Sequence, residues 1–201
     1  SSSLQVHVWQ YNGATWVNLG NQGTALANQP DLASGPGGDL YLTWLQAPFG
    51  TNINSQVFAL RRTGGSWVDM GGSSIVPGIS SATGGVSRPA APKIAYAAQP
   101  SPRVVVAWLA GTNNAHSVLL RQHNFSGGWT GVGGAGDVPG IARLRGSSTN
   151  LGFALSSKGV PSVVFENNET GLSEVQVYQQ VLDISPPSFA GLQSAVGGTN
   201  N

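Results

Sequence analysis

Short apolar runs separated by Gly, Pro, Asn and Ser recur along the whole chain of 201 residues. Each run is rich in β-branched or aromatic residues and is bounded by turn-forming residues, which is typical of β-strands. No stretch combines an apolar period of about 3.6 residues with helix-capping residues. The pattern therefore predicts an all-β protein with essentially no helix.

Four of these runs begin with valine and align with one another: VHVWQY from Val6, VFALRR from Val57, VLLRQH from Val118 and VQVYQQ from Val175. A turn follows each run, and an aromatic residue follows the turn. The first three turns are near copies, YNGATWVNLG, RTGGSWVDMG and NFSGGWTGVG, and the fourth is degenerate. The aromatic residues are Trp16, Trp67, Trp129 and Phe189. Such self-similarity at a period of ~50–60 residues is the signature of a repeat architecture.

Two further strands precede the valine-led strand in each complete repeat. The first is seen in PDLAS at 30–34, PKIAYA at 92–97 and LGFALS at 151–156, and the second in LYLTW, VVVAW and PSVVF. Each repeat thus holds four short antiparallel strands, A to D in chain order. Runs such as VVVAW are apolar at every position, which favours a sheet buried on both faces between two like sheets. This is the packing of a β-propeller blade.

The strand count predicts that the sequence opens with strands C and D of one repeat, followed by three complete repeats. We expect a single partial β-propeller of about three and a half blades, with residues 193–201 as a tail. The half blade spans residues 4–20, and the complete blades span residues 30–71, 92–133 and 150–192. A seven-bladed ring at this period needs about twice this length. A solenoid or a flat array of sheets remains the architectural alternative.

The half blade contains strands C and D but not A and B, and an unpaired strand edge invites association. We therefore expect the chain to be part of a larger ring, in which another chain or segment completes the propeller. Two identical chains do not supply the missing strands neatly, because both contribute C and D halves.

The motifs resemble secreted bacterial β-propeller arrays whose blades carry an N-G-x-x-W-x-x-L-G turn and a strand ending in Trp. The matching segments are Tyr11–Gly20, Arg62–Gly71, Asn124–Gly133, Leu40–Trp44 and Val104–Trp108. The resemblance implies an architecture and not an activity. Some propellers with comparable repeats are sugar-binding lectins, such as the seven-bladed bacterial fucose-binding type, but no sugar site matches residue by residue. The Asp-box of sialidases and the WD40 and kelch signatures are absent.

Composition narrows the choice of partners and compartment. Charged residues make up 8% of the chain, against roughly 25% in typical soluble domains, and the formal net charge is +1. This charge provides no basic footprint for nucleic acid, and no apolar run is long enough for a membrane span. Cysteine is absent, which excludes disulfides and thiolate chemistry. The Gly-, Ser-, Thr- and Asn-rich surface suits an extracellular bacterial protein, and a first residue Ser1 suits a processed or trimmed product.

Candidate ligand residues fall on the long B–C and D–A loops, which share one end of a propeller. GTNINSQV at 50–57 matches GTNNAHSV at 111–118, and amide groups that donate and accept together suit sugar hydroxyls. Arginines on the D–A loops suit carboxylates. The alternative is that the amides form Asx-type turns and that the arginines are structural. The candidates are Asn52, Asn54, Asn113, Asn114 and His116 on B–C loops, and Arg88, Arg143 and Arg145 on D–A loops.

The remaining polar patterns are weaker. ENNETG at 166–171 resembles a calcium loop in its oxygen spacing but lacks the aspartates and the distal acid, which favours an ordinary turn. Glu166 and Glu169 are the one candidate glycosidase pair. The three histidines have no metal-ligand spacing, and nucleophile-elbow, phosphate-loop and dinucleotide motifs are absent. We therefore assign no catalytic residue, no metal and no cofactor. The repeated VPGI segments indicate a shared loop conformation, and the repeated tryptophans indicate packing.

These observations favour a non-catalytic extracellular binding module, lectin-like or protein-binding, with a carbohydrate or protein ligand. Two alternatives stay open, because a fold does not determine a function. The chain is otherwise a structural or assembly subunit of a propeller, or part of a glycoside hydrolase or sialidase-like propeller enzyme.

Overall fold

The computed structural model describes residues 4–24, 26–47, 55–76, 78–80, 89–112, 115–133, 140–141, 143–145, 148–168, 174–181 and 188–192. Within these ranges the regular structure consists of β-strands and one short 3-10 turn, η1 (Pro36–Gly38). The predicted all-β fold, built from four-stranded antiparallel sheets, is confirmed. None of the helical structure in these ranges has the length and apolar character that a membrane crossing requires.

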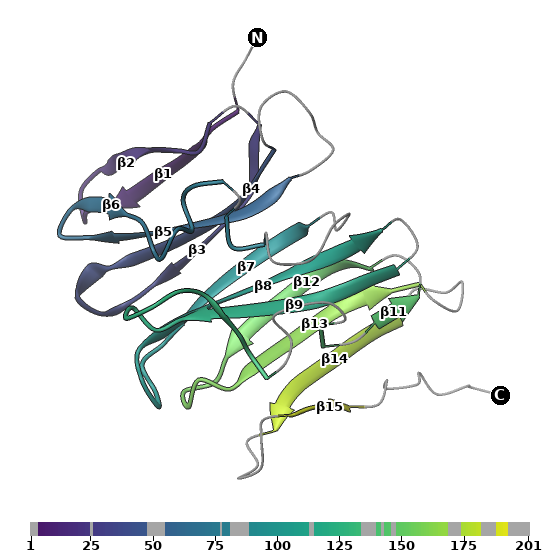
Figure 1. Cartoon of the computed structure of the whole chain (residues 1–201). Helices are drawn as coiled ribbons and strands as arrows, with labels where there is room; N and C mark the ends of the chain where they lie inside the picture. Colours follow the sequence, from purple (N-terminus) through teal and green to yellow (C-terminus); the bar gives the residue numbers. More distant parts are fainter. Residues whose placement is uncertain are drawn as a thin grey trace.

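The strands form four antiparallel sheets that follow one another along the chain (Figure 1). We number them I to IV. Sheet I contains β1 (Val6–Tyr11) and β2 (Trp16–Gln22). Sheet II contains β3 (Ala27–Ser34), β4 (Leu40–Gln46), β5 (Gln56–Thr63) and β6 (Ser66–Val68). Sheet III contains β7 (Ala90–Ala97), β8 (Arg103–Thr112), β9 (Ala115–His123) and β10 (Thr130–Gly131), with β11 (Arg143–Arg145) also paired to β9. Sheet IV contains β12 (Ser148–Leu155), β13 (Pro161–Asn167), β14 (Glu174–Val181) and β15 (Ser188–Leu192).

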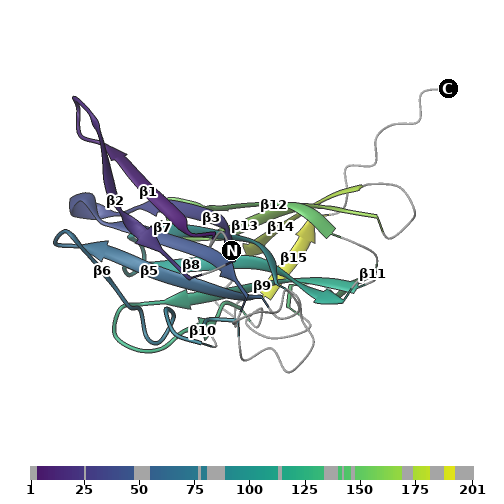
Figure 2. The ribbon, with the colours of Figure 1, turned by 90° about the horizontal axis from the view of Figure 1, so that it is seen from above.

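The sheets lie in layers, with sheets I and IV at opposite ends of the row (Figures 1 and 2). Each boundary between neighbouring sheets holds its own hydrophobic cluster. Leu42 and Phe58 pack under sheet I, Val106 and Trp108 pack against sheet II, and Val163 packs against sheet III. The central strands β4, β5, β8 and β9 are buried on both sides because each of their sheets has a neighbour on each face, as the unbroken apolar runs predicted.

The first strands of sheets II, III and IV share one backbone irregularity. Gln29, Ala91 and Asn150 have positive φ angles of 49°, 49° and 54°, and the pairing register shifts beside each of them. This common bulge shows that the repeat extends to backbone detail. Each of these strands also begins earlier than expected, at residues 27, 90 and 148 rather than 30, 92 and 151.

Two polar side chains of β3 serve the equivalent bulge of β7 in the next sheet. The Gln29 side-chain oxygen accepts the Ala91 N–H at 2.7 Å, and the Asp31 carboxylate accepts the Ile94 N–H at 2.8 Å. Lys93 also lies 3.8 Å from the Asp31 carboxylate. The first strands of sheets II and III, β3 and β7, are thus joined by hydrogen bonds as well as by apolar contact.

Sheet I is only half as wide as its neighbours. In the described part of the chain, β1 pairs with β2 alone, as the missing A and B strands predicted. One consequence is seen at Leu32 on β3, which is 45% exposed, whereas the equivalent Ile94 on β7 is 6% exposed against sheet II. Because sheet I has only the strands β1 and β2 among the described residues, it does not extend over β3, and Leu32 stays exposed.

Candidate functional site

Five of the predicted ligand residues lie outside the described residues: Asn52, Asn54, Arg88, Asn113 and Asn114. The other three, His116, Arg143 and Arg145, lie on adjacent strands. Arg143 pairs with Ser117, Leu144 with His116 and Arg145 with Ala115. The structure therefore brings these three residues of two separate loops together in one strand pair.

The segment around Arg143 corrects one expectation. Arg143 and Arg145 were expected to lie on a D–A loop, but Arg143–Arg145 forms the strand β11. The short strand β10 pairs with β9 only at Arg121 and Gln122. The rest of that edge of β9, nearer the B–C hairpin, is left without pairing by β10, and β11 pairs with it there. An unpaired edge of backbone donors and acceptors favours such pairing.

The repeated VPGI segments have the same structural role in both repeats. The Ile79 N–H donates to the Val57 carbonyl at 2.8 Å, and the Ile141 N–H donates to the Val118 carbonyl at 2.9 Å. The preceding glycines, Gly78 and Gly140, have φ angles of +68° and +71°. A Cβ at either position would overlap the carbonyl that its neighbour bonds. The prediction of a shared loop conformation is confirmed for the Gly–Ile part of each segment, which covers the edge of β5 or β9. Pro77, Val138 and Pro139 lie outside the described residues.

A compact group of aromatic and charged side chains lies at the boundary of sheets II and III. Asp39 is buried, and both Nε and Nη2 of Arg61 donate to its carboxylate. The guanidinium lies over Tyr41 and over Phe125, and Tyr41 stacks on Tyr96 with centroids 5.4 Å apart. All of these side chains meet others of the same group, so the group binds the two sheets together rather than offering a site for a ligand.

The environment of Asp39 and Tyr41 shifts the pKa of both groups away from neutral pH. Burial raises the pKa of the Asp39 carboxyl, but hydrogen bonds from Arg61, Thr63 and Tyr41, together with the Arg61 charge, lower it below its usual value. Burial raises the pKa of Tyr41 to about 12. Asp39 therefore stays ionised and Tyr41 neutral at physiological pH, which is what the ion pair requires. The sequence contains little sign of this group, because Asp39 precedes β4 and Arg61 lies on β5, 22 residues further along the chain.

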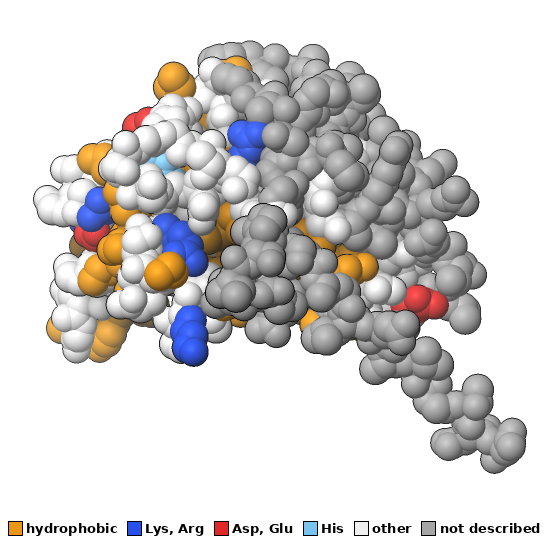
Figure 3. Space-filling view, turned by 60° about the horizontal axis from the view of Figure 1, so that its bottom comes forward, with side chains coloured by type: hydrophobic (Ala, Val, Ile, Leu, Met, Phe, Trp, Pro, Cys, Tyr) orange, Lys and Arg blue, Asp and Glu red, His pale blue; other side chains and the backbone are white. Residues whose placement is uncertain are grey.

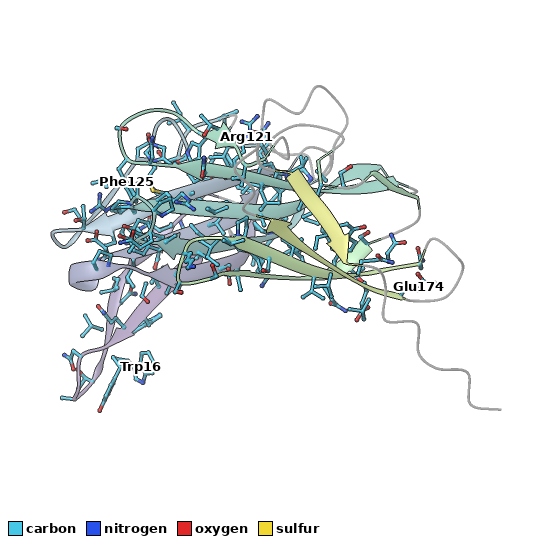
Figure 4. All side chains as sticks on the ribbon, turned by 90° about the horizontal axis from the view of Figure 1, so that it is seen from below. Trp16, Arg121, Phe125 and Glu174 are labelled. Atoms are coloured by element: carbon cyan, nitrogen blue, oxygen red, sulfur yellow. The ribbon has the colours of Figure 1, made fainter. Side chains whose placement is uncertain are left out.

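Arg121 and His123 at this boundary form hydrogen bonds with backbone groups. Arg121 on β9 donates through Nη1 to the Ile79 carbonyl at 3.1 Å, and Figure 4 shows Arg121 and Phe125 on the same side of the sheets. His123 is buried, and its Nδ1 accepts the Phe125 N–H at 3.1 Å. Burial lowers the pKa of His123, which keeps the ring neutral.

Of the candidate glycosidase pair, only Glu166 lies among the described residues. Thr149 donates weakly to the Glu166 carboxylate at 3.4 Å, while Glu169, Thr170 and Gly171 lie outside the described residues. Among the described residues, no three His, Asp or Glu side chains gather to hold a metal ion. Figure 3 shows one face of the molecule, on which the charged side chains of the described residues are scattered.

The tryptophans of the repeated turn differ from one another in a regular way. Trp67 and Trp129 are partly buried, as expected for packing residues. The Trp67 indole N–H donates to the Leu19 carbonyl in sheet I, and the Trp129 indole N–H donates to the Met70 carbonyl in the segment after sheet II. Trp16 occupies the same position in sheet I but is 66% exposed. Figure 4 shows its side chain pointing away from the row of sheets. The same motif is therefore a packing residue inside the row and a surface residue at its end.

No family model matches the chain, and no curated protein matches it.

Proposed function

We propose that this chain is a non-catalytic, extracellular carbohydrate-binding module whose ligand binds at the end of the sheets where the β8–β9 hairpin meets β11. The observation that carries this proposal is the pairing of β11 with β9, in which Leu144 lies opposite His116 and both arginines flank that pair. The backbones of two loops that are separate in the sequence thereby meet at one end of sheet III.

The chemistry of these residue types suits a neutral or weakly anionic sugar. Imidazole and guanidinium groups donate hydrogen bonds to hydroxyl and carboxylate oxygens. With a net charge of +1 and 8% charged residues, the protein has no strong field that would select a polyanion. Each direct hydrogen bond contributes about 0.5–1.5 kcal/mol, so single sites bind weakly and several repeats acting together raise the apparent affinity.

The proposal includes the larger architecture. The blade-like sheets stack through equivalent interfaces, which is the arrangement that a propeller continues around a ring. In such a ring the B–C loops of successive blades rise at one end, and equivalent loops repeat the same binding groups. The resemblance to secreted bacterial propeller arrays, some of them lectins, supports the same assignment.

The test is glycan-array binding followed by titration calorimetry with any sugar that binds. His116→Ala and the double variant Arg143→Ala/Arg145→Ala are each expected to weaken binding by about 10-fold or more, the loss of one to two charge-assisted hydrogen bonds. Changing Asn113 and Asn114 to Ala tests the neighbouring amides. Lys158→Ala is the matched control, because Lys158 is an exposed cation in the turn at the opposite end of sheet IV.

The control variant should bind as the unchanged protein does. Binding that survives all changes near β11, but is lost when the turns at residues 12–14 or 64–66 are altered, would place the ligand at the other end. Absence of binding to every glycan on the array would overturn the choice of ligand.

A further inference from the structure

The indole groups of the repeated tryptophans join neighbouring sheets by one rule. Trp67 Nε1 donates to the Leu19 carbonyl at 2.9 Å, and Trp129 Nε1 donates to the Met70 carbonyl at 2.7 Å. Leu19 lies three residues after Trp16, and Met70 lies three residues after Trp67. Each tryptophan thus bonds to the carbonyl that lies three residues beyond the previous one. In each case the tryptophan of the later sheet donates to a backbone carbonyl of the earlier sheet or of the segment after it. The rule therefore distinguishes a donating face, which carries the tryptophan, from a receiving face, which carries the carbonyl.

Sheet I presents its donating face, the one that carries Trp16, with no described sheet over it. Besides Trp16, the side chains of His7, Trp9 and Tyr11 are exposed there, and the Tyr11 and Trp16 rings lie 5.7 Å apart. The repeat aligns His7 with Phe58 on β5 and with Leu119 on β9, and both of those side chains are buried under the preceding sheet. It aligns Trp9 with Leu60, which is buried as well. The exposed face is therefore the same surface that sheets II and III bury.

Sheet IV presents the complementary face at the other end of the row. Val175 and Val177 on β14 are 57% and 40% exposed, whereas the residues aligned with them in sheets II and III are completely buried. Val164 on β13 is exposed in the same way. The acceptor position also recurs, because Leu192 on β15 lies three residues after Phe189, which takes the tryptophan position.

We propose that these two faces bind each other between two copies of the chain, with β14 and β15 of one copy packed on β1 and β2 of the other. Trp16 Nε1 then donates to the Leu192 carbonyl of the other copy. The contact continues the interface that already occurs three times within the chain, between sheets I and II, II and III, and III and IV.

The composition of the two faces fits this occupant. The strands β1, β2, β14 and β15 carry a single charged residue, Glu174, so no like charges oppose the contact. Exposed apolar sheet faces of this kind mark interaction sites. The contact is heterologous, because two different faces meet, and it adds further copies unless the assembly closes. It needs no strands A and B, and it does not depend on the proposed sugar ligand.

The test uses sedimentation velocity over a range of protein concentrations with one variant on each face. Trp16→Lys alters the face of sheet I, and Val177→Glu alters the face of sheet IV. The unchanged chain is expected to associate as the concentration rises, and each variant alone is expected to remain monomeric. An equimolar mixture of the two variants retains one intact pair of faces and should form a 1:1 dimer.

Two further variants separate this contact from a general surface effect. Ile75→Lys changes a residue that is as exposed as Trp16, at 66%, but lies on the loop after β6, so it should associate as the unchanged chain does. Trp16→Phe keeps a ring but removes the indole N–H, and should weaken association about 2- to 12-fold, the loss of one hydrogen bond. Circular dichroism checks that every variant keeps its β spectrum.

Several results would overturn the proposal. One is an unchanged chain that stays monomeric at all concentrations. Another is a Trp16→Phe variant that associates with unchanged affinity. A third is a Val177→Glu variant that still dimerises alone, since that would show two copies meeting through their sheet I faces. A mixture of the two folded variants that fails to dimerise would also contradict the head-to-tail arrangement.

Discussion

The guanidinium of Arg61 lies 5.0 Å from the ring centroid of Phe125, across the boundary between sheets II and III. The same guanidinium pairs with the buried Asp39 carboxylate, so one side chain neutralises an acid and packs on an aromatic ring. A cation over an aromatic face and a charge-assisted fork reinforce each other when partly shielded from water. Arg61 thus stabilises the packing of sheet II against sheet III at the edge of their interface.

Arg61→Ala is expected to lower the free energy of unfolding by about 1–3 kcal/mol, because it leaves the Asp39 carboxylate buried without its main partner. Arg61→Lys keeps the charge but loses the planar fork, and should cost less. Urea denaturation at pH 7 measures both. Lys158→Ala removes an exposed cation and should stay within about 0.5 kcal/mol of the unchanged protein. Equal losses in Arg61→Ala and Lys158→Ala would refute the role assigned to the pair.

His123 should make stability fall as the solution becomes more acidic. Burial lowers its pKa in the folded state below the value of about 6.5 in the unfolded chain. As the pH falls through that value, the unfolded chain takes up a proton that the folded protein does not, and unfolding becomes easier. Protonation of Nδ1 would also break the bond from the Phe125 N–H.

The measurement compares the urea midpoint at pH 8 and pH 5.5. The drop between these pH values should shrink in His123→Gln, whatever the absolute stability of that variant. His7→Gln is the matched control, because His7 is exposed. A drop that is the same in His123→Gln as in the unchanged protein would show that other groups cause it.

Gly78→Ala and Gly140→Ala should both destabilise the protein strongly. Each glycine has a positive φ, and an added Cβ would overlap the carbonyl of Val57 or Val118. We expect a loss of about 2–4 kcal/mol, in which the strain of positive φ and the steric overlap add. Gly37 also has positive φ, +66°, but has open space around it, so Gly37→Ala should cost only about 1–2 kcal/mol. Thermal unfolding that ranks Gly37→Ala as the worst of the three would contradict this account.

Leu32 and Ile94 occupy the same position in sheets II and III, yet truncation should affect them differently. Ile94→Ala removes buried volume and is expected to cost about 2–5 kcal/mol. Leu32 is exposed because sheet I lacks the inner strands, so Leu32→Ala should cost less than about 1 kcal/mol. Chemical denaturation of the two variants measures the difference. A loss as large for Leu32 as for Ile94 would show that another part of the protein covers Leu32.

By itself, the sequence determined the four-strand repeat and its half-repeat offset, because strand runs and turn residues act locally. The unbroken apolar run VVVAW predicted a strand buried on both faces, and β8 is such a strand. The recurrence of VPGI predicted a shared loop conformation, since the glycine with positive φ is a local requirement that recurs with the motif.

Of the candidate site, the sequence predicted the loops but not their pairing. His116 and Arg145 were assigned to separate loops, and their meeting depends on the open edge of β9, which exists only once β10 has paired with the other end of that strand. The ion pair of Asp39 and Arg61 was missed for a related reason: the partners are brought together by strand pairing and not by proximity in the chain.

The three tryptophans of the repeated turn show most clearly what only the tertiary structure decided. Trp16, Trp67 and Trp129 stand in nearly identical sequence contexts, so no local pattern distinguishes them. Whether the indole is buried and bonded depends on a carbonyl in the preceding sheet, which is a contact across about 50–60 residues of chain. Trp16 is exposed because no sheet of the described chain lies before it, and that is a property of the assembled row of sheets.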